Sequence, residues 1–391
     1  MSGAAGSTPP AGPIAIGVLG LGTAGRSAIA AIARSARCAL VACCDLDAAL
    51  VAQQSRAGEV AGHRSVGELA ADPAVEAVYL ATPTAQRLAH VEELASAGKH
   101  LLIEKPLGRN GAEAARIARR CAEEGIVAVA VNTRGRDPAI RLMASIVASG
   151  ELGRVLGVTN LNYAPWILRP RYPYELDPDL GGGVIFRQAP HQVEIVRSVI
   201  ASPIVSVCAT ATHSREPVET VAGYHALIRF ADGASASLVY NGYGYFDTAE
   251  LTGGIGENGM ARSPGAGVRL RRLAAWAADK YGVDGEHARR FELSEQAGDA
   301  APVGLSTYGL TIVSCEGGDL RQTSDGVAVY DGSAIRPLVC DARGSGLDGD
   351  LEEFWGALRE GLPPRHGVAW GAETARVCEA IATSAVTGRP A

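Results

Sequence analysis

Lys105 and His191 are the two residues whose type and setting suit proton transfer. Lys105 stands in Glu104-Lys105-Pro106, directly after an apolar run at 100–104. Partial burial near another positive charge lowers a lysine pKa from about 10.4 towards about 7–8, where it can take a proton from a hydroxyl group. His191 follows three glycines at 181–183, and its pKa lies near working pH. The sequence therefore predicts acid–base chemistry with Lys105 and His191 as catalytic residues; a surface lysine and a structural histidine are the competing interpretations.

A glycine motif near the N-terminus predicts a phosphate-binding turn. Gly20-Leu-Gly22-Thr-Ala-Gly25 follows an apolar run at 14–19 and opens a helix-like stretch. In such a motif the first glycine allows a tight turn and the second lets the backbone approach a pyrophosphate. The third lets the helix pack on the strand. Twenty residues on, Asp45 ends the next apolar run. An ordinary glycine turn is the alternative, but the context favours a dinucleotide site formed by Gly20, Gly22, Thr23, Ala24, Gly25 and Asp45.

Asp45 bears on the choice of dinucleotide. A carboxylate there accepts hydrogen bonds from both ribose hydroxyls and repels a 2′-phosphate, and no arginine follows it directly. We therefore expect NAD as the cofactor, with NADP as the less favoured choice. Asp45 and Asp47 as simple helix caps would leave that choice open.

Two further segments belong to the same edge of the predicted sheet. Ala81-Thr82-Pro83 ends the run at 76–81, as Glu104-Lys105 ends the run at 100–104. The carboxyl ends of parallel strands line the cofactor crevice in a doubly wound sheet. The expected contacts on this side of the cofactor are Ala81, Thr82, Pro83, Glu104, Lys105 and Asn132.

The order of elements predicts two domains, as the length of 391 residues favours. Residues 14–133 alternate between strands and helices, which predicts an NAD-binding Rossmann domain of the α/β class with a doubly wound parallel sheet. Residues 134–391 predict an α+β substrate and oligomerisation domain with a large open, mostly antiparallel sheet. Residues 1–13 are expected to be a flexible tail, and 242–308 an insertion that serves as a lid or an oligomer contact. The C-terminal helix is free to pack back on the Rossmann domain.

The individual elements follow from apolar periodicity and glycine stops. Strands are expected at 14–19, 39–44, 76–81, 100–104, 126–131, 154–163, 203–212, 223–231, 234–242, 309–315, 318–322 and 326–330. Helices are expected at 24–36, 86–97, 110–123, 137–149, 182–200, about 268–281, 346–361 and 369–387.

Composition excludes several classes of protein. The net charge of −6, without a block rich in Lys and Arg, argues against nucleic acid as a partner. No apolar run approaches the ~18 residues that span a bilayer, and the first 13 residues lack the pattern of a signal peptide. We therefore expect a cytoplasmic protein. The eight cysteines show no metal-ligand spacing, so reduced, buried thiols and no metal site are expected.

Together the motifs resemble the glucose-fructose oxidoreductase / inositol dehydrogenase / rhizopine-catabolism (Gfo/Idh/MocA) family over residues 14–388. The resemblance implies a Rossmann domain, a nicotinamide cofactor and a C-terminal α/β domain with an open sheet. It also implies Lys105 and His191 as catalytic residues. A homo-dimer or homo-tetramer formed through the C-terminal sheet is implied as well.

One residue departs from that family. Sugar and polyol members usually carry an aspartate four residues before the histidine, and this chain has Arg187. A guanidinium pairs bidentately with a carboxylate, which predicts a small carboxylated substrate. Arg169 and Arg171 are expected to assist in substrate binding, with a solvated surface position as the alternative. Internal pairing of Arg187 with Glu175 or Asp177 is the main competing interpretation for that residue.

A narrower resemblance is to the phthalate 4,5-cis-dihydrodiol dehydrogenase-like group. It rests on residues 169–191, the 242–308 insertion and 313–322. The resemblance implies oxidation of a carboxylated cyclohexadiene cis-diol to a catechol by hydride transfer. The alternatives are a sugar, inositol or secondary-metabolite dehydrogenase of the same family, an enzyme that retains and recycles NAD, and a non-catalytic NAD-sensing or accessory protein.

Overall fold

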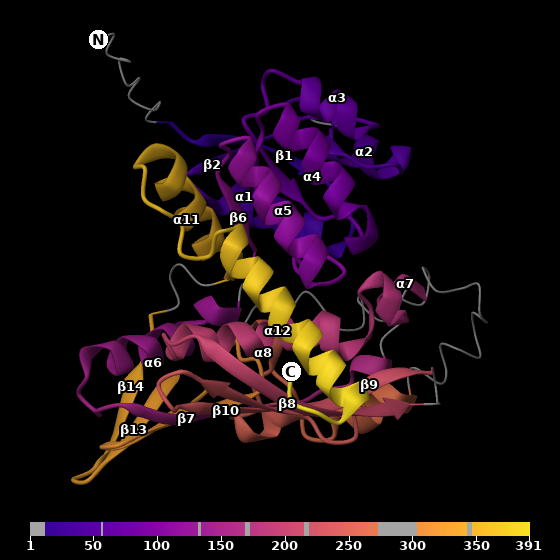
Figure 1. Ribbon diagram of the computed structural model, residues 1–391. Coiled ribbons are helices and arrows are strands. Elements are labelled where there is room, and N and C mark those ends of the chain that lie inside the picture. Colours follow the sequence, from indigo (N-terminus) through magenta and orange to yellow (C-terminus); the bar gives the residue numbers. More distant parts are fainter. Residues whose placement is uncertain are drawn as a thin grey trace. The chain divides into compact units, whose positions relative to one another are not determined.

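The computed structural model describes residues 12–55, 58–131, 134–168, 173–214, 219–272, 303–341 and 346–391 (Figure 1). The chain divides into two compact units. The first comprises Met1–Asn132 and Gly346–Glu373, and the second comprises Thr133–Ser345 and Thr374–Ala391. None of the described helices combines the length and the apolar composition that crossing a bilayer requires.

The first unit contains a six-stranded parallel sheet. Its strands are β1 (Ile14–Leu19), β2 (Cys38–Cys44), β3 (Ala61–His63), β4 (Ala77–Leu80), β5 (His100–Ile103) and β6 (Ala128–Ala130). Their order is β3-β2-β1-β4-β5-β6, the doubly wound order in which ligands bind where the strand order reverses, between β1 and β4. The predicted Rossmann class is therefore confirmed.

Helices cover this sheet, and this explains why its central strands are apolar throughout. Helix α1 packs against α11, and α4 packs against α3 and α5. Their bounds are α1 (Thr23–Arg34), α2 (Ala48–Gln54), α3 (Val66–Ala71), α4 (Arg87–Ser96), α5 (Gly111–Glu123) and α11 (Gly346–Arg359). The Arg359 guanidinium donates to both oxygens of Glu76, at 2.6 and 2.7 Å, and so fixes the late helix α11 to the residue before β4.

The second unit contains an eight-stranded sheet. Its strands are β7 (Val155–Tyr163), β8 (Ile204–Ser214), β9 (Thr220–Phe230), β10 (Ser235–Asn241), β11 (Leu310–Cys315), β12 (Gly318–Gln322), β13 (Gly326–Asp331) and β14 (Ile335–Val339). The order is β14-β13-β12-β11-β7-β10-β9-β8, and every pair is antiparallel except β10 with β7. This agrees with the predicted mostly antiparallel sheet.

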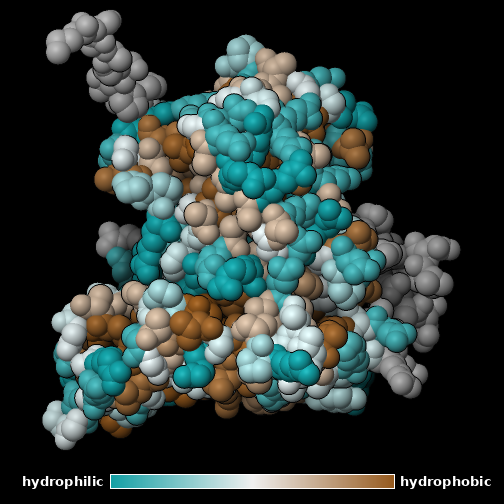
Figure 2. All heavy atoms as spheres, in the orientation of Figure 1, coloured by the Kyte–Doolittle hydropathy of each residue, from teal (hydrophilic) through white to brown (hydrophobic). Residues whose placement is uncertain are grey.

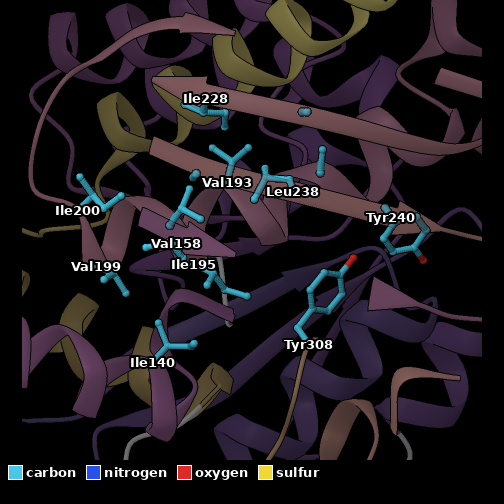
Figure 3. Packing of buried hydrophobic residues seen from close by; sticks show 14 of the residues in the cluster. Ile140, Val158, Val193, Ile195, Val199, Ile200, Ile228, Leu238, Tyr240 and Tyr308 are labelled. Carbon is cyan, nitrogen blue, oxygen red and sulfur yellow. The ribbon is translucent and has the colours of Figure 1, made fainter. Parts of the chain in front are cut away.

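One face of this sheet is buried by helices. The α-helices named in the described part of the unit are α6 (Pro138–Ser149), α7 (Pro173–Leu176), α8 (Gly183–Val199) and the part of α12 (Val368–Thr387) that follows residue 373; residues 266–272 are helical as well. Figure 3 shows the packing, in which Val193 of α8 lies close to Ile228 and Leu238 of the sheet. A buried polar group fixes α8 here: the Gln192 amide donates to Asn160 Oδ1 (2.6 Å), and its oxygen accepts from the Tyr224 hydroxyl. Satisfied buried networks of this kind define one orientation of a helix.

The other face of the sheet carries mostly exposed or half-buried side chains, and none of the named α-helices of the described residues packs on it. One cross-strand row on it runs through four paired residues on four strands. In strand order they are Leu227, Ser237, Thr159 and Ile312. Leu227 is 49% exposed although it is apolar. Figure 2 shows brown apolar residues among polar ones on the surface of the second unit.

The structure differs from the predicted elements in a few places. Helices α2 and α3 and strands β3 and β14 were not predicted, because they are short and largely exposed. Of the helix expected at about 268–281, residues 268–272 are helical, and the remainder lies outside the described residues. The described part of the insertion is held to the sheet, since Thr248 Oγ1 accepts from the Tyr163 backbone N–H (2.7 Å). It also lines a small recess at the end of β7, through Asp247, Glu257 and Arg262.

Asp137, at the start of α6, gives the second unit a pH dependence. Its carboxyl is 1% exposed, and burial raises its pKa from 3.8 to about 7, although Arg134 at 3.7 Å opposes the shift. Between about pH 4 and pH 7 the unfolded chain releases this proton while the folded chain keeps it. Stability from this group is therefore present at low pH and lost as the pH rises through 7.

We expect Asp137→Asn to abolish the loss of folding stability that Asp137 causes as the pH rises. Relative to wild type, the variant should gain stability on going from pH 5 to pH 8, by up to about 3 kcal/mol. Thermal unfolding at the two pH values measures the gain, and Asp179→Asn, at an exposed aspartate, serves as the control. A difference between Asp137→Asn and wild type that is the same at both pH values would contradict the assignment.

Candidate active site

The turn between β1 and α1 requires glycine for steric reasons. Gly20 has φ +93°, and a Cβ there would lie 2.9 Å from the Ala81 carbonyl oxygen. A Cβ at Gly25 would lie 1.8 Å from the Gly20 carbonyl oxygen, so no other residue fits. A Cβ at Gly22 would meet nothing within 4 Å, so the backbone there is open to a ligand.

Gly22 is also the N-cap of α1, and no side chain among the described residues caps this helix. The N–H groups of the first turn, which begins with Thr23 and Ala24, are therefore left for a ligand or for water. A helix N-terminus with an open glycine approach is suited to a pyrophosphate. The residues at 20–25 thus fit a dinucleotide on geometric grounds.

Asp45 and Asp47 have different roles. Asp47 caps α2, because its side chain accepts from the backbone N–H of Ala49 and Leu50. Asp45 lies at the end of β2 and accepts from the Leu21 backbone N–H at 2.7 Å, so it holds the glycine turn. A carboxylate has further lone pairs for ribose hydroxyls, and the capping alternative applies to Asp47 alone.

Arg64 is a residue that sequence analysis did not single out. It follows β3, and its guanidinium donates to the Leu46 carbonyl at 2.7 Å, one residue beyond Asp45. No arginine follows Asp45 directly in the sequence. Arg64 nevertheless reaches the residue after Asp45, because β3 pairs with β2. The spacing along one strand cannot reveal a neighbour from the next strand.

The strand ends of β4 and β5 carry the other predicted cofactor contacts. Ala81 and Pro83 flank Thr82, whose hydroxyl lies 3.0 Å from His90 Nδ1. The buried Tyr79 hydroxyl donates to Glu104 Oε1 (2.6 Å). Glu104 Oε2 accepts from the Lys105 backbone N–H (3.1 Å), and the Lys105–Pro106 peptide bond is cis. Lys105 is half-buried at this edge of the sheet.

His191 lies in the second unit, on α8, directly after Pro190. It is 8% exposed, and its ring centroid lies 4.8 Å from that of Tyr308. The Tyr308 hydroxyl donates to Gln188 Oε1 at 2.6 Å, so the tyrosine is itself fixed to α8. Gln192 points to the sheet, and His191 lies about 100° around the helix from it. The imidazole is therefore held in a defined orientation.

Arg187 forms an internal ion pair. Its Nη2 donates to Glu175 Oε1 at 3.0 Å, and the Glu175 side chain is 4% exposed. Arg187 therefore has the internal partner that the competing interpretation named, and Glu175 offsets its charge. Arg187 remains one helical turn before His191, on the same face of α8. A substrate carboxylate there would have to share the guanidinium with Glu175.

Arg134 and Tyr308 were not identified from the sequence. The Arg134 guanidinium carbon lies 5.5 Å from the centroid of the Tyr308 ring, which in turn contacts His191. Arg134 also donates to Ser306 Oγ and is 8% exposed. Arg134 is thus a buried cation that is separated from His191 by one side chain, that of Tyr308. Of the other predicted site residues, Arg169, Arg171 and Asn132 lie outside the described residues.

Two family models match the chain. Residues 14–133 match the oxidoreductase family with an NAD-binding Rossmann fold, and residues 140–261 match the GFO/IDH/MocA C-terminal domain.

Known proteins match over most of the chain. A 1-carboxy-3-chloro-3,4-dihydroxycyclohexa-1,5-diene dehydrogenase from Comamonas testosteroni is 29% identical, covering 94% of this chain and 93% of its own. The structure of a protein from Bordetella bronchiseptica RB50, described as a dehydrogenase, is 30% identical with a TM-score of 0.87 and covers 97% and 99% of the two chains. The WlbA dehydrogenase from Bordetella pertussis, solved with NADH and UDP-GlcNAcA, is 19% identical with a TM-score of 0.72 over 97% and 98%.

The glycine turn, the sheet order, the two family models and these full-length similarities agree with one another. The chain belongs to the Gfo/Idh/MocA family of NAD-binding oxidoreductases.

Proposed function

We propose that this chain is an NAD-dependent dehydrogenase that oxidises a carboxylated cyclohexadiene cis-diol to a catechol. The observation that carries the proposal is the similarity, over nearly both full lengths, to a dehydrogenase named for a carboxylated dihydroxycyclohexadiene. Arg187 and Arg134 support it, because both are basic side chains in the neighbourhood of His191.

In this proposal Gly22 and the first turn of α1 hold the pyrophosphate, and Asp45 holds the adenosine ribose. Bound NAD⁺ supplies the acceptor for the hydride that leaves the carbinol carbon. Lys105 and His191 bond to the hydroxyl on that carbon and take up its proton. The carbinol carbon becomes a carbonyl, and the resulting hydroxyenone tautomerises to the catechol, so that aromatisation favours oxidation.

Two further features complete the proposal. The uncovered sheet face with Leu227 supports a homo-dimer or homo-tetramer formed through the C-terminal sheet. The cysteines among the described residues are free thiols, which supports a cytoplasmic location.

A second candidate is a sugar or inositol dehydrogenase of the same family. The Arg187–Glu175 pair favours it, because a neutralised guanidinium does not by itself demand an anionic substrate. Purified protein mixed with NAD⁺ and a panel of carboxylated cis-diols, uncharged cis-diols, pentoses and inositols separates the two. We expect NADH absorbance to rise fastest with the carboxylated diols; a response confined to sugars or inositols would overturn the first proposal.

Lys105→Arg and His191→Asn test the two catalytic roles. Arginine keeps the charge but does not give up its proton, so we expect kcat/KM to fall by about 10²- to 10⁴-fold in each variant. NADH affinity, measured by fluorescence, should change far less. The control is His225→Asn, at an exposed histidine of β9. Retained turnover in either catalytic variant would remove that residue from the mechanism.

Arg187→Ala and Glu175→Gln test the carboxylate-binding role. Loss of one charge-assisted pair should raise KM for carboxylated diols by about 10- to 100-fold. The KM of Arg187→Ala for uncharged diols should change little. Glu175→Gln releases the guanidinium from its competitor, so KM for the carboxylated substrate should fall. Equal effects of Arg187→Ala on charged and uncharged diols would refute the role.

Asp45→Asn tests the ribose contact. The amide no longer repels a 2′-phosphate and accepts fewer hydrogen bonds, so NAD⁺ affinity should fall and the preference over NADP⁺ should narrow, each by about tenfold. Asp47→Asn is the matched control, because asparagine caps a helix as well as aspartate does. Titration of both nucleotides by calorimetry gives the ratio. An unchanged ratio in Asp45→Asn would show that Asp45 serves only the glycine turn.

A further inference from the structure

Arg87 is a buried cation that neither the glycine motif nor the catalytic pair accounts for. It is the first residue of α4 and is 3% exposed. Its Nη2 donates to the Thr82 carbonyl at 2.8 Å, and its Nη1 donates to the Pro106 carbonyl. One side chain therefore joins the turns that follow two neighbouring strands.

The sheet ladder does not extend as far as these turns. Leu80 and Ile103 are the last paired residues of β4 and β5, and the backbone contact closes with Glu104 N–H donating to the Leu80 carbonyl (3.1 Å). Thr82 lies two residues beyond the end of β4, and Pro106 lies three residues beyond the end of β5. Arg87 continues the cross-link where backbone pairing has stopped, and Lys105 lies directly before one of its two anchor points.

The residue type at position 87 suits this work. A guanidinium offers several donors in a rigid planar fork and does not lose its proton, whereas a lysine ammonium is a single point of attachment. The positive charge of Arg87 also affects the pKa values of neighbouring groups. Burial lowers the pKa of His90, and the Arg87 charge lowers it further. In general, a fixed positive charge close to a lysine amine disfavours the protonated form of that amine.

We propose that Arg87 is the positioning residue of Lys105: its guanidinium ties the Thr82 and Pro106 carbonyls together and so fixes the direction in which the Lys105 side chain leaves the sheet edge. This inference rests on the proposed proton-transfer role of Lys105. It adds a residue that touches neither the substrate nor the cofactor and acts through the two turns.

The chain offers a direct way to observe Lys105. Its sequence contains only three lysines, Lys99, Lys105 and Lys280. Labelling with [ε-¹³C]lysine therefore gives three side-chain resonances, and Lys105→Arg assigns the one of interest. Its titration reports the pKa of Lys105 without any substrate.

The test variants are Arg87→Ala and Arg87→Lys. The control is Arg116→Ala, which removes an exposed arginine of α5 that pairs with Glu92 of α4, the helix that also carries Arg87. We expect Arg87→Ala to raise the Lys105 pKa by on the order of one unit. It should also lower kcat/KM by about 100-fold, as loss of alignment does. Arg87→Lys should keep the Lys105 pKa near the wild-type value and still lower kcat, because one ammonium does not hold both carbonyls. Arg116→Ala should match wild type in every measurement.

The inference is overturned if folded Arg87→Ala leaves the Lys105 titration unchanged and kcat/KM within about twofold of Arg116→Ala. Should Arg87→Ala fail to fold, Arg87→Lys decides, and wild-type kcat in that variant rejects the positioning role. If the wild-type protein oxidises none of the diols, the proposed substrate is wrong. The Lys105 titration then still tests Arg87 independently.

Discussion

The carbonyl oxygen of Gly20 occupies the space that any side chain at position 25 would need. Helix α1 can approach β1 this closely only because Gly25 has no Cβ. The approach places the N-terminus of α1 beside the reversal point of the strand order, where Gly22 leaves the backbone open. Asp45 then holds the same turn through the Leu21 N–H. The cofactor-binding edge thus depends on one backbone contact supported by one carboxylate.

In the proposed mechanism, arginines hold structural contacts and one lysine transfers a proton. Arginines carry the contacts that must persist: Arg359 holds α11, Arg87 joins the strand-end turns, and Arg187 pairs with Glu175. Of 36 lysines and arginines only three are lysines, and the proposed mechanism assigns proton transfer to one of them, Lys105. Lys99, by contrast, is buried and donates to the carbonyls of Asp72 and Val75. A lysine at 105 is consistent with acid–base work because arginine does not titrate in the working range.

Much of the fold could be predicted from the sequence, because apolar runs and glycines act locally. The glycine motif predicted the β1–α1 turn, and strand ends predicted where Thr82, Glu104 and Lys105 lie. Partners contributed by distant segments could not be predicted. Glu175 beside Arg187 was one of two named possibilities, and spacing alone did not choose between them. Tyr308 lies against His191 only because the strand that follows it, β11, pairs with β7, and no local pattern indicates that contact.

The central claim is that Lys105 and His191 act on the same substrate hydroxyl. A crystal structure of the protein with NADH and a carboxylated catechol product tests it most directly. The account predicts one catechol oxygen within about 3.2 Å of both Lys105 Nζ and a ring nitrogen of His191. A product whose hydroxyls contact neither residue, with Lys105 directed away from the nicotinamide, would contradict it.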